Sequence, residues 1–334
     1  MNALKTIAAA AILAAGPALA DEVNIYSYRQ PDLVKPLTKA FTKETGIKVN
    51  IAFLQKGMIE KMTAEGRRSP VDLVLTTDIS RLHDIVEAGL AQPVTSEILA
   101  ANIPAEFRDP GDQWFGLTSR ARVVFAAKDR VAEGAVTTYE DLADPKWRGR
   151  ICTRSGTHSY TLALVSAFLA HHGEAETRAW LEGVKANLAR KPQGNDRAQV
   201  KAIWSGECDI SLGNTYYMGE MLAEPEQKDW ADAVRIVFPV FEDGGTHVNL
   251  SGVAMAKHAP NRDAALTFIE WLSSPEAQTI YAEANYEYPL LETAETSDLV
   301  ASWGDFTADG LNLMDVARLR GASLRLVEEV DFDG

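Results

Sequence analysis

The chain has 334 residues, with 33 basic residues (Lys, Arg) against 47 acidic residues (Asp, Glu) and a formal net charge of −14. Hydrophobic residues make up 46% of the chain and charged residues 24%, which is typical of a globular protein and excludes disordered, collagenous and low-complexity classes. The acidic surplus argues against a nucleic-acid-binding protein, because no basic stripe is available to neutralise phosphates.

Residues 1–20, MNALKTIAAAAILAAGPALA, have the pattern of a secretory signal peptide. Lys5 provides the positive charge, residues 6–15 are apolar, and Ala18-Leu19-Ala20 is a small-residue cleavage site. The apolar segment is too short to cross a bilayer, which requires about 20 residues. We therefore expect export, removal of residues 1–20, and a mature chain that is not embedded in the membrane.

Strand and helix patterns alternate after the cleavage site. The expected order is strand 23–27, helix 31–45, strand 47–53, helix 58–65, strand 71–75 and a helix from residue 79 to Gly89. A second block follows with strand 150–154, helices 160–172, 176–188 and 197–204, strand 208–212 and a helix from residue 215 to 222. This alternation predicts an α/β protein with mostly parallel sheets covered by helices.

Two long extended stretches, residues 113–128 and 244–255, separate and follow the second block. Two such crossings are expected of a protein with two lobes joined by hinge segments. We assign residues 21–118 plus 247–295 to an amino-terminal lobe and residues 119–246 plus 296–334 to a carboxy-terminal lobe. Ligands of open α/β sheets bind beyond the carboxyl ends of the strands, so the cleft between the lobes is the expected site.

Enzymatic motifs are absent from the sequence: it has no G-x-G-x-x-G, Walker A, H-E-x-x-H, G-x-S-x-G or EF-hand pattern. The six histidines show no metal-ligand spacing. His158 precedes a tyrosine in a loop, so a functional role for it stays open. A secreted hydrolase that uses a tyrosine or His158 in acid–base chemistry is the alternative from the enzyme class.

Three tyrosines occupy equivalent places in two predicted strand-to-helix turns. Tyr160 follows Cys152 by eight residues, and Tyr216, with Tyr217 directly after it, follows Cys208 by eight residues; a glycine-containing polar turn lies between in both cases. Both turns are expected at the same edge of one sheet, so the three phenols can converge on the cleft. The two cysteines would meet an oxidising compartment, where they form one disulfide or remain as two buried thiols.

Three converging phenols suit a hard trivalent cation, which prefers oxygen donors and displaces the phenol protons. Three phenolates would cancel three positive charges, which favours ferric ion over Ca²⁺ or Zn²⁺. The alternative is that the tyrosine pair simply packs at the start of a helix, as aromatic pairs often do.

Several segments resemble periplasmic ferric-ion-binding proteins, the solute receptors of bacterial iron ABC importers. They are VNIYSYRQP, DLVLTTDISRL, QWFGLTSRARV, LARKPQGNDR, GNTYYMG and LSGV. The resemblance covers essentially the whole mature chain. It implies a type II periplasmic-binding-protein fold whose two α/β lobes close on Fe³⁺, with Tyr160, Tyr216 and Tyr217 as ligands. It also implies a periplasmic receptor rather than an enzyme, a monomer, and an inner-membrane permease with its ATPase as partners.

The sequence departs from one part of this family, in which a His-Tyr pair follows the first-strand arginine and can bind iron. Gln30 and Pro31 follow Arg29 here. The resemblance is to the subgroup in which an exogenous anion such as carbonate completes the coordination shell. The expected anion-binding residues are Arg120 and Arg29 and, more weakly, Gln30 and Thr157. Alternatively, the two arginines form surface or hinge salt bridges.

A receptor for an organic or oxyanion solute, such as a polyamine, a phosphonate or thiamine, is the alternative within the binding class. A polyamine site calls for carboxylates, and no Asp or Glu lies within three residues before any of the three tyrosines.

Overall fold

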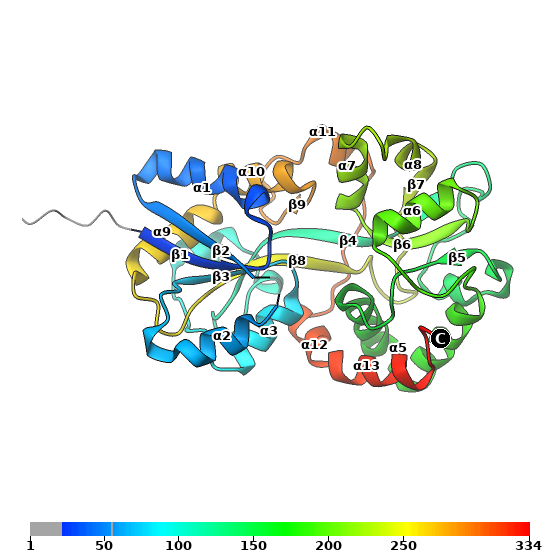
Figure 1. Cartoon of the computed structure of the whole chain (residues 1–334), viewed down its shortest axis with the longest axis horizontal. Helices are drawn as coiled ribbons and strands as arrows, with labels where there is room; N and C mark the ends of the chain where they lie inside the picture. The colour runs from blue at the N-terminus through cyan, green and yellow to red at the C-terminus, as the bar shows by residue number, and fades with distance from the viewer. Residues whose placement is uncertain (1–21, 55) are drawn as a thin grey trace, which may run out of the picture.

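The structure, a computed structural model, describes residues 22–54 and 56–334. The predicted signal peptide lies outside the described residues. Two α/β lobes lie side by side, and the strands β4 (Phe115–Ala127) and β8 (Val248–Met255) run between them (Figure 1). Within the described residues, no helix combines the length and the apolar character needed to cross a membrane.

The first lobe is built on β1 (Glu22–Ser27), β2 (Lys48–Phe53) and β3 (Leu73–Thr76). β1 pairs in parallel with both neighbours, with Val23 opposite Val49 and Ile25 opposite Leu73, as the strand–helix alternation predicts. One face is covered by α1 (Pro31–Thr45), α9 (Arg262–Leu272) and α10 (Pro275–Asn285), and the other by α2 (Met58–Glu65) and α3 (Ile79–Glu87).

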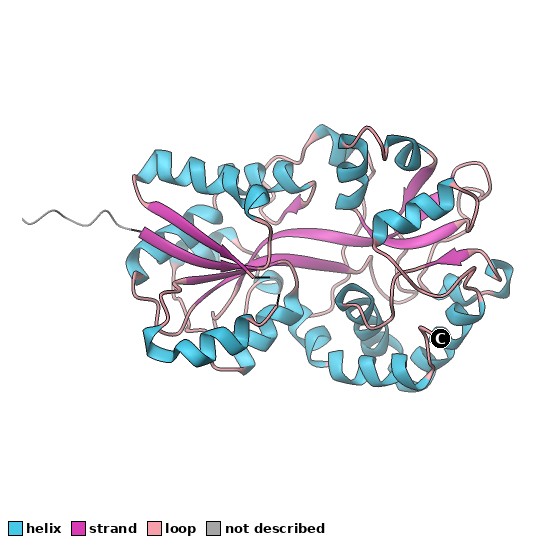
Figure 2. Ribbon diagram, in the orientation of Figure 1, coloured by secondary structure: helices cyan, strands magenta, loops and turns pink. Residues whose placement is uncertain are grey.

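The second lobe contains β5 (Ile151–Cys152), β6 (Ile210–Asn214), β7 (Val234–Val237) and the second half of β4. Its apolar core includes Trp147 and Phe241 together with Phe168 of the long helix α5 (Ser159–Ala186). The other helices of this lobe are α6 (Asp196–Trp204), α7 (Tyr216–Ala223), α8 (Lys228–Asp232) and α13 (Arg320–Glu329). Figure 2 shows the strands as one band through both lobes, with helices on either side.

The remaining elements are short: α4 (Glu97–Asn102), β9 (Tyr288–Pro289), α11 (Asp298–Ala301) and α12 (Leu313–Arg318). α12 lies where the lobes meet. Leu313 and Met314 belong to the core of the first lobe, whereas Val316 belongs to the core of the second. The lobe boundaries given above stay predictions, since β4 passes from one lobe to the other without a break at residues 118 and 119.

The expectation of mostly parallel sheets needs a correction. Strands within the strand–helix–strand units are parallel, but β3–β8, β4–β8, β4–β6, β4–β7 and β4–β9 all pair antiparallel, so the sheet is mixed. The reason is that β4 and β8 pass between the lobes antiparallel to each other. β8 pairs with β3 of the first lobe, and β4 pairs with β6 of the second lobe.

Local signals set most helix ends. α1 begins and ends where predicted, and Gly46 closes it with φ 76°, a left-handed conformation that glycine adopts without steric cost. The two helices predicted at residues 160–172 and 176–188 lie within α5 and meet at a kink at Gly173, where φ is 77° and ψ is 178°. The backbone of Gly173 is not helical, which confirms the predicted stop of the first helix there.

Candidate functional site

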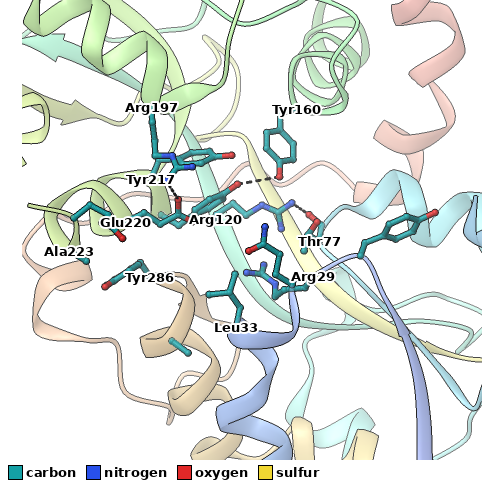
Figure 3. A pocket seen from close by; sticks show the side chains of 15 residues that line it. Arg29, Leu33, Thr77, Arg120, Tyr160, Arg197, Tyr217, Glu220, Ala223 and Tyr286 are labelled. Carbon is teal, nitrogen blue, oxygen red and sulfur yellow. Dashed lines mark hydrogen bonds and ion pairs between the residues drawn. The ribbon is translucent and has the colours of Figure 1, made fainter. Parts of the chain in front are cut away.

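A cavity of about 520 Å³ lies in the cleft between the lobes (Figure 3). The first lobe contributes the segment after β1, the start of α1, the turn after β3 and the end of α10. The second lobe contributes the first turns of α5 and α6 and most of α7, and Arg120 of β4 completes the lining. The polar residues that line it are Tyr28, Arg29, Gln30, Thr77, Arg120, Tyr160, Arg197, Tyr216, Tyr217, Glu220, Glu224 and Tyr286.

Three of these lining residues are the tyrosines that the sequence singled out. The Tyr216 hydroxyl donates a hydrogen bond to the Tyr160 hydroxyl at 3.2 Å, and the rings of Tyr216 and Tyr217 lie 4.3 Å apart. They meet because β5 and β6 are parallel neighbours, with Cys152 opposite Ser211. The turns that leave the two strands therefore emerge at one edge of the sheet, and α5 and α7 each begin there.

Burial sets the protonation of the tyrosine pair. It raises the pKa of Tyr216 well above the ordinary value of 10.0, and Tyr160 and Tyr217 raise it further by repulsion between phenolates. Burial, followed by repulsion from Asp196, raises the pKa of Tyr217 to about 12. Both phenols are therefore neutral at pH 7 without a cation, and a bound cation has to displace their protons.

Two buried guanidinium groups, of Arg122 and Arg154, lie near the tyrosines. Arg154 and Arg122 both pair with the fully buried Asp196, at 2.9 and 2.7 Å. Two guanidinium groups thus share one carboxylate, which leaves a surplus positive charge. The Arg154 guanidinium lies 5.1 Å from the centre of the Tyr160 ring, so this charge favours oxygen anions in the cavity. Sequence reasoning missed this cluster, although Arg154 stands in the same turn as Tyr160.

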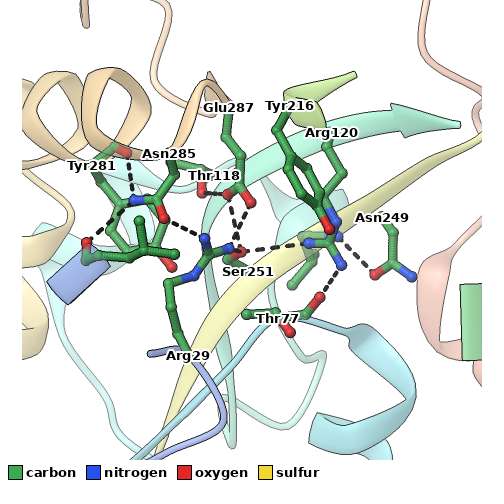
Figure 4. A network of polar contacts seen from close by, with 12 residues as sticks. Arg29, Thr77, Thr118, Arg120, Tyr216, Asn249, Ser251, Tyr281, Asn285 and Glu287 are labelled. Atoms are coloured by element: carbon green, nitrogen blue, oxygen red, sulfur yellow. Dashed lines mark hydrogen bonds and ion pairs between the residues drawn. The ribbon is translucent and has the colours of Figure 1, made fainter. Parts of the chain in front are cut away.

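The two predicted anion-binding arginines are buried in a polar network beneath the cavity (Figure 4). Arg29 donates to Glu287 at 2.6 Å and to Ser251 at 2.8 Å, and it also contacts Asn285. Arg120 donates to the Thr77 carbonyl and, at 3.4 Å, to Ser251. Both line the cavity, but the charge of Arg29 is already balanced by a carboxylate, whereas the hydrogen bonds of Arg120 are to neutral oxygens.

The weaker candidates are placed differently. Gln30 is exposed and lines the cavity. Thr157 is exposed, is not among the lining residues, and its hydroxyl oxygen lies 2.9 Å from that of Ser155.

His158 caps α5, because its Nδ1 accepts a hydrogen bond from the Tyr160 N–H at 3.1 Å. Burial and then Arg154 lower the pKa of His158 to about 3, so the ring is neutral, as an acceptor requires.

A disulfide and a hydrogen bond from the end of the chain fix the turns that carry the tyrosines. Cys152 and Cys208 form a disulfide with a Cα–Cα distance of 5.9 Å, which ties β5 to the segment that enters β6. The carboxyl end of the chain also fixes the first turn, since the Gly156 N–H donates to Asp333 at 2.6 Å. No local sequence signal marks the role of Asp333, because it lies 177 residues away from Gly156.

Two carboxylates also line the cavity. Glu220 and Glu224 line it from α7, and Glu220 lies 3.7 Å from Arg197. Glu220 follows Tyr217 by one helical turn, so it lies outside the three residues before each tyrosine, which contain no carboxylate. Within the described part of the chain, no cluster of three His, Cys, Asp or Glu side chains could hold a metal ion. The oxygen donors that converge in the cavity are thus mainly the phenols.

Two α/β lobes around a polar cleft define a two-lobed ligand-binding protein. Residues 37–308 match the family model of the bacterial extracellular solute-binding proteins. The chain belongs to this family, which confirms the predicted fold class and the predicted class of binding protein.

Its relatives within the family include proteins named for iron. Iron uptake protein A1 of Synechocystis is 44% identical over 95% of this chain and 89% of the relative. The structure of Mannheimia haemolytica ferric iron-binding protein A in an open conformation is 54% identical, has a TM-score of 0.90 and covers 94% of this chain and 100% of its own. A Trichodesmium protein solved with iron and citrate ligands is 39% identical, with a TM-score of 0.89 over 93% of this chain and 99% of its own.

Proposed function

We propose that this protein is a periplasmic receptor that captures ferric iron and delivers it to an inner-membrane ABC permease driven by its ATPase. The observation that carries the proposal is the convergence of Tyr160, Tyr216 and Tyr217 in one cavity between the lobes. The names of the relatives, an iron uptake protein and ferric iron-binding proteins, support the same cargo.

The chemistry of the three phenols fits Fe³⁺. A hard trivalent cation prefers oxygen donors, and it can displace the protons of neutral, buried phenols because three phenolates then balance its charge. Arg120 favours the phenolate of Tyr216 and Arg154 favours that of Tyr217, each against the opposing charge of Asp196. Because the cavity is lined from both lobes, a bound cation favours the arrangement in which the lobes close on it.

A small oxyanion is proposed as a second guest, because three phenolates leave positions of the metal open. A cavity of about 520 Å³ has room for more than a bare ion. Arg120 is the better-supported anion partner, since its hydrogen bonds among the described residues are to neutral oxygens, while Arg29 is directly paired with Glu287. We retain carbonate as the proposed anion, and the relative solved with iron and citrate makes citrate the second anion to test.

The first prediction concerns the tyrosines. Tyr216→Phe and Tyr160→Phe should each lower the affinity for ferric ion by at least about tenfold, because each removes one anionic oxygen donor. Adding ferric ion should give the wild-type protein a visible absorption band from phenolate-to-iron charge transfer, and the band should be weaker in both variants. The titration is run with bicarbonate, with citrate and without either.

Tyr288→Phe is the matched control. Its hydroxyl is buried without a partner among the described residues, and it does not line the cavity. This variant should bind ferric ion like the wild type. A wild-type protein that stays colourless, as a receptor for an organic solute would, contradicts the proposed cargo.

A further inference from the structure

One side chain of the first lobe presses against the helix that carries the tyrosine pair. Tyr286 ends α10, and its ring lies against Gly219 of α7. A Cβ atom added to Gly219 would lie 2.2 Å from Cγ of Tyr286, and 2.5 and 2.7 Å from the next two ring atoms. Such distances leave no room for any side chain, so this contact depends on glycine at position 219.

The backbone on both sides of the contact is adapted to it. Tyr286 has φ 54° and ψ 37°, in the left-handed region that residues other than glycine rarely adopt. Gly219 lies inside an eight-residue helix, where glycine is less favourable than alanine. The left-handed backbone of Tyr286 and the glycine inside α7 are both unfavourable locally, and they meet in this contact. This coincidence indicates that the contact between the ring and the helix offsets their cost.

The contact joins parts of the molecule that would move relative to each other. α10 packs against α1 in the first lobe, and β9, just after Tyr286, pairs with Thr118 and Ser119 of β4. α7 belongs to the second lobe and starts with Tyr216 and Tyr217, so Gly219 lies within one helical turn of both. In Figure 3, Tyr286 lies beside Glu220 and Ala223 at the edge of the same cavity.

We infer that the ring of Tyr286, seated on Gly219, is the interlobe contact that positions α7 and thereby sets the placement of its two tyrosines against the first lobe. Tyr286 is a positioning residue in this role and not a ligand. The ring makes the contact, since no hydrogen bond of its hydroxyl occurs within the described residues. The consequence for cargo rests on the proposed ferric-ion function, but the consequence for lobe placement does not.

Gly219→Ala is the direct test. The new methyl group should push the ring away, change the distance between the lobes and weaken retention of ferric ion against citrate by about tenfold, a typical coupling between sites. Alanine is the better helix former, so a purely local effect would instead stabilise α7. Gly219→Ala combined with Tyr286→Ala removes the clash and should recover retention relative to Gly219→Ala alone.

Three further variants make the test specific. Gly321→Ala, in a helix where an added Cβ would meet nothing within 4 Å, should leave both readouts unchanged. Tyr286→Phe keeps the ring and should therefore keep the wild-type distances between the lobes. Tyr286→Ala removes the contact without a clash, and should broaden the distribution of interlobe distances even if Gly219→Ala fails to fold.

The interlobe distance is measured on metal-free protein by pulsed electron spin resonance between labels at Lys43→Cys and Glu182→Cys. Both positions are exposed, one in each lobe, and the native cysteines are already joined. The inference is overturned if Gly219→Ala and Tyr286→Ala both keep the wild-type distances. If the wild type itself shows no ferric absorption band, the proposed function fails, while the distance measurement still decides the role of Tyr286.

Discussion

Beneath the cavity, the buried Arg29 guanidinium is paired with the buried Glu287 carboxylate. Burial by itself would raise the pKa of the Glu287 carboxyl, but Arg29 and then Arg120 outweigh it, so the pKa lies below its ordinary value of 4.5. Thr118 and Ser251 also donate to this carboxylate. The pair therefore stays ionised at neutral pH and fixes the end of β1 to the segment after α10.

Removing one partner of this pair should be costly. Glu287→Ala leaves the Arg29 guanidinium buried without its counter-charge, and we expect a loss of about 3–5 kcal/mol in the free energy of unfolding. Urea denaturation at pH 7.5 measures the loss. Glu292→Ala, at an exposed glutamate, is the control and should stay within about 0.5 kcal/mol of the wild type. Equal effects of the two variants would contradict a stabilising role for the pair.

The protonation of the cavity predicts that acid releases the cargo. Because the pKa of Tyr217 is about 12 and that of Tyr216 is higher than usual, ferric binding displaces protons, and protons compete with the metal as the pH falls. We expect the charge-transfer band to disappear below roughly pH 5–6 and to return on neutralisation. Retention of iron at pH 3 would contradict phenolate ligation.

Among the secondary-structure elements, β5 and β6 matter most for the site, because both tyrosine-bearing turns leave from their carboxyl ends. β5 has only two residues, so backbone pairing alone holds it weakly to β6. The disulfide between Cys152 and Cys208 adds a covalent link at this position. It closes a loop of 56 residues in the unfolded chain.

Loss of the disulfide should lower the free energy of unfolding by about 4 kcal/mol, because the unfolded chain regains the entropy of this loop. The measurement is urea denaturation of Cys152→Ala/Cys208→Ala, with the reduced wild-type protein as a second sample. At low temperature, where the variant is still folded, it should bind ferric ion, since the tyrosines themselves are unchanged. Identical stability with and without the bond would show that the rest of the lobe already fixes the two strands.

The whole molecule should lose stability in acid for reasons separate from the cargo. Burial, helped by nearby arginines, lowers the pKa values of His158 and His247 from 6.5 to about 3 in each case. Between those pH values the unfolded chain binds protons that the folded chain does not, so folding stability decreases as the pH falls below 6.5. The Glu287 contribution is complete above about pH 4.5 and is lost as the pH falls through its lowered pKa.

Metal-free protein should therefore show a falling free energy of unfolding at pH 7.5, 5.5 and 4.5, measured in urea. His247→Asn should make this dependence shallower whatever its effect at pH 7.5, because position 247 then no longer titrates. His258→Asn, at an exposed histidine, should keep the wild-type slope. A wild-type stability that is independent of pH over this range would contradict the two buried neutral histidines.

Local sequence patterns determined much of the architecture. The hydrophobic spacing of residues 31–45 and the glycine after it fixed α1, and the strand–helix alternation fixed the parallel part of the first lobe. The equal spacing from each cysteine to its tyrosine also placed Tyr160 with Tyr216 and Tyr217, because parallel neighbouring strands end at one edge of a sheet. Such features depend on neighbours within a few residues, so one sequence is enough to indicate them.

The surroundings of the tyrosines, in contrast, depend on contacts between distant parts of the chain. The antiparallel crossing of β4 and β8, the pairing of Arg29 with Glu287, and the seat of Tyr286 on Gly219 join residues far apart in the chain. Charge balance and close packing depend on distances in space, and the sequence separation of two residues does not fix these distances. The three phenols together with the family resemblance thus led to the prediction of a ferric ligand, whereas the charges and the lobe contact around the phenols could not be predicted.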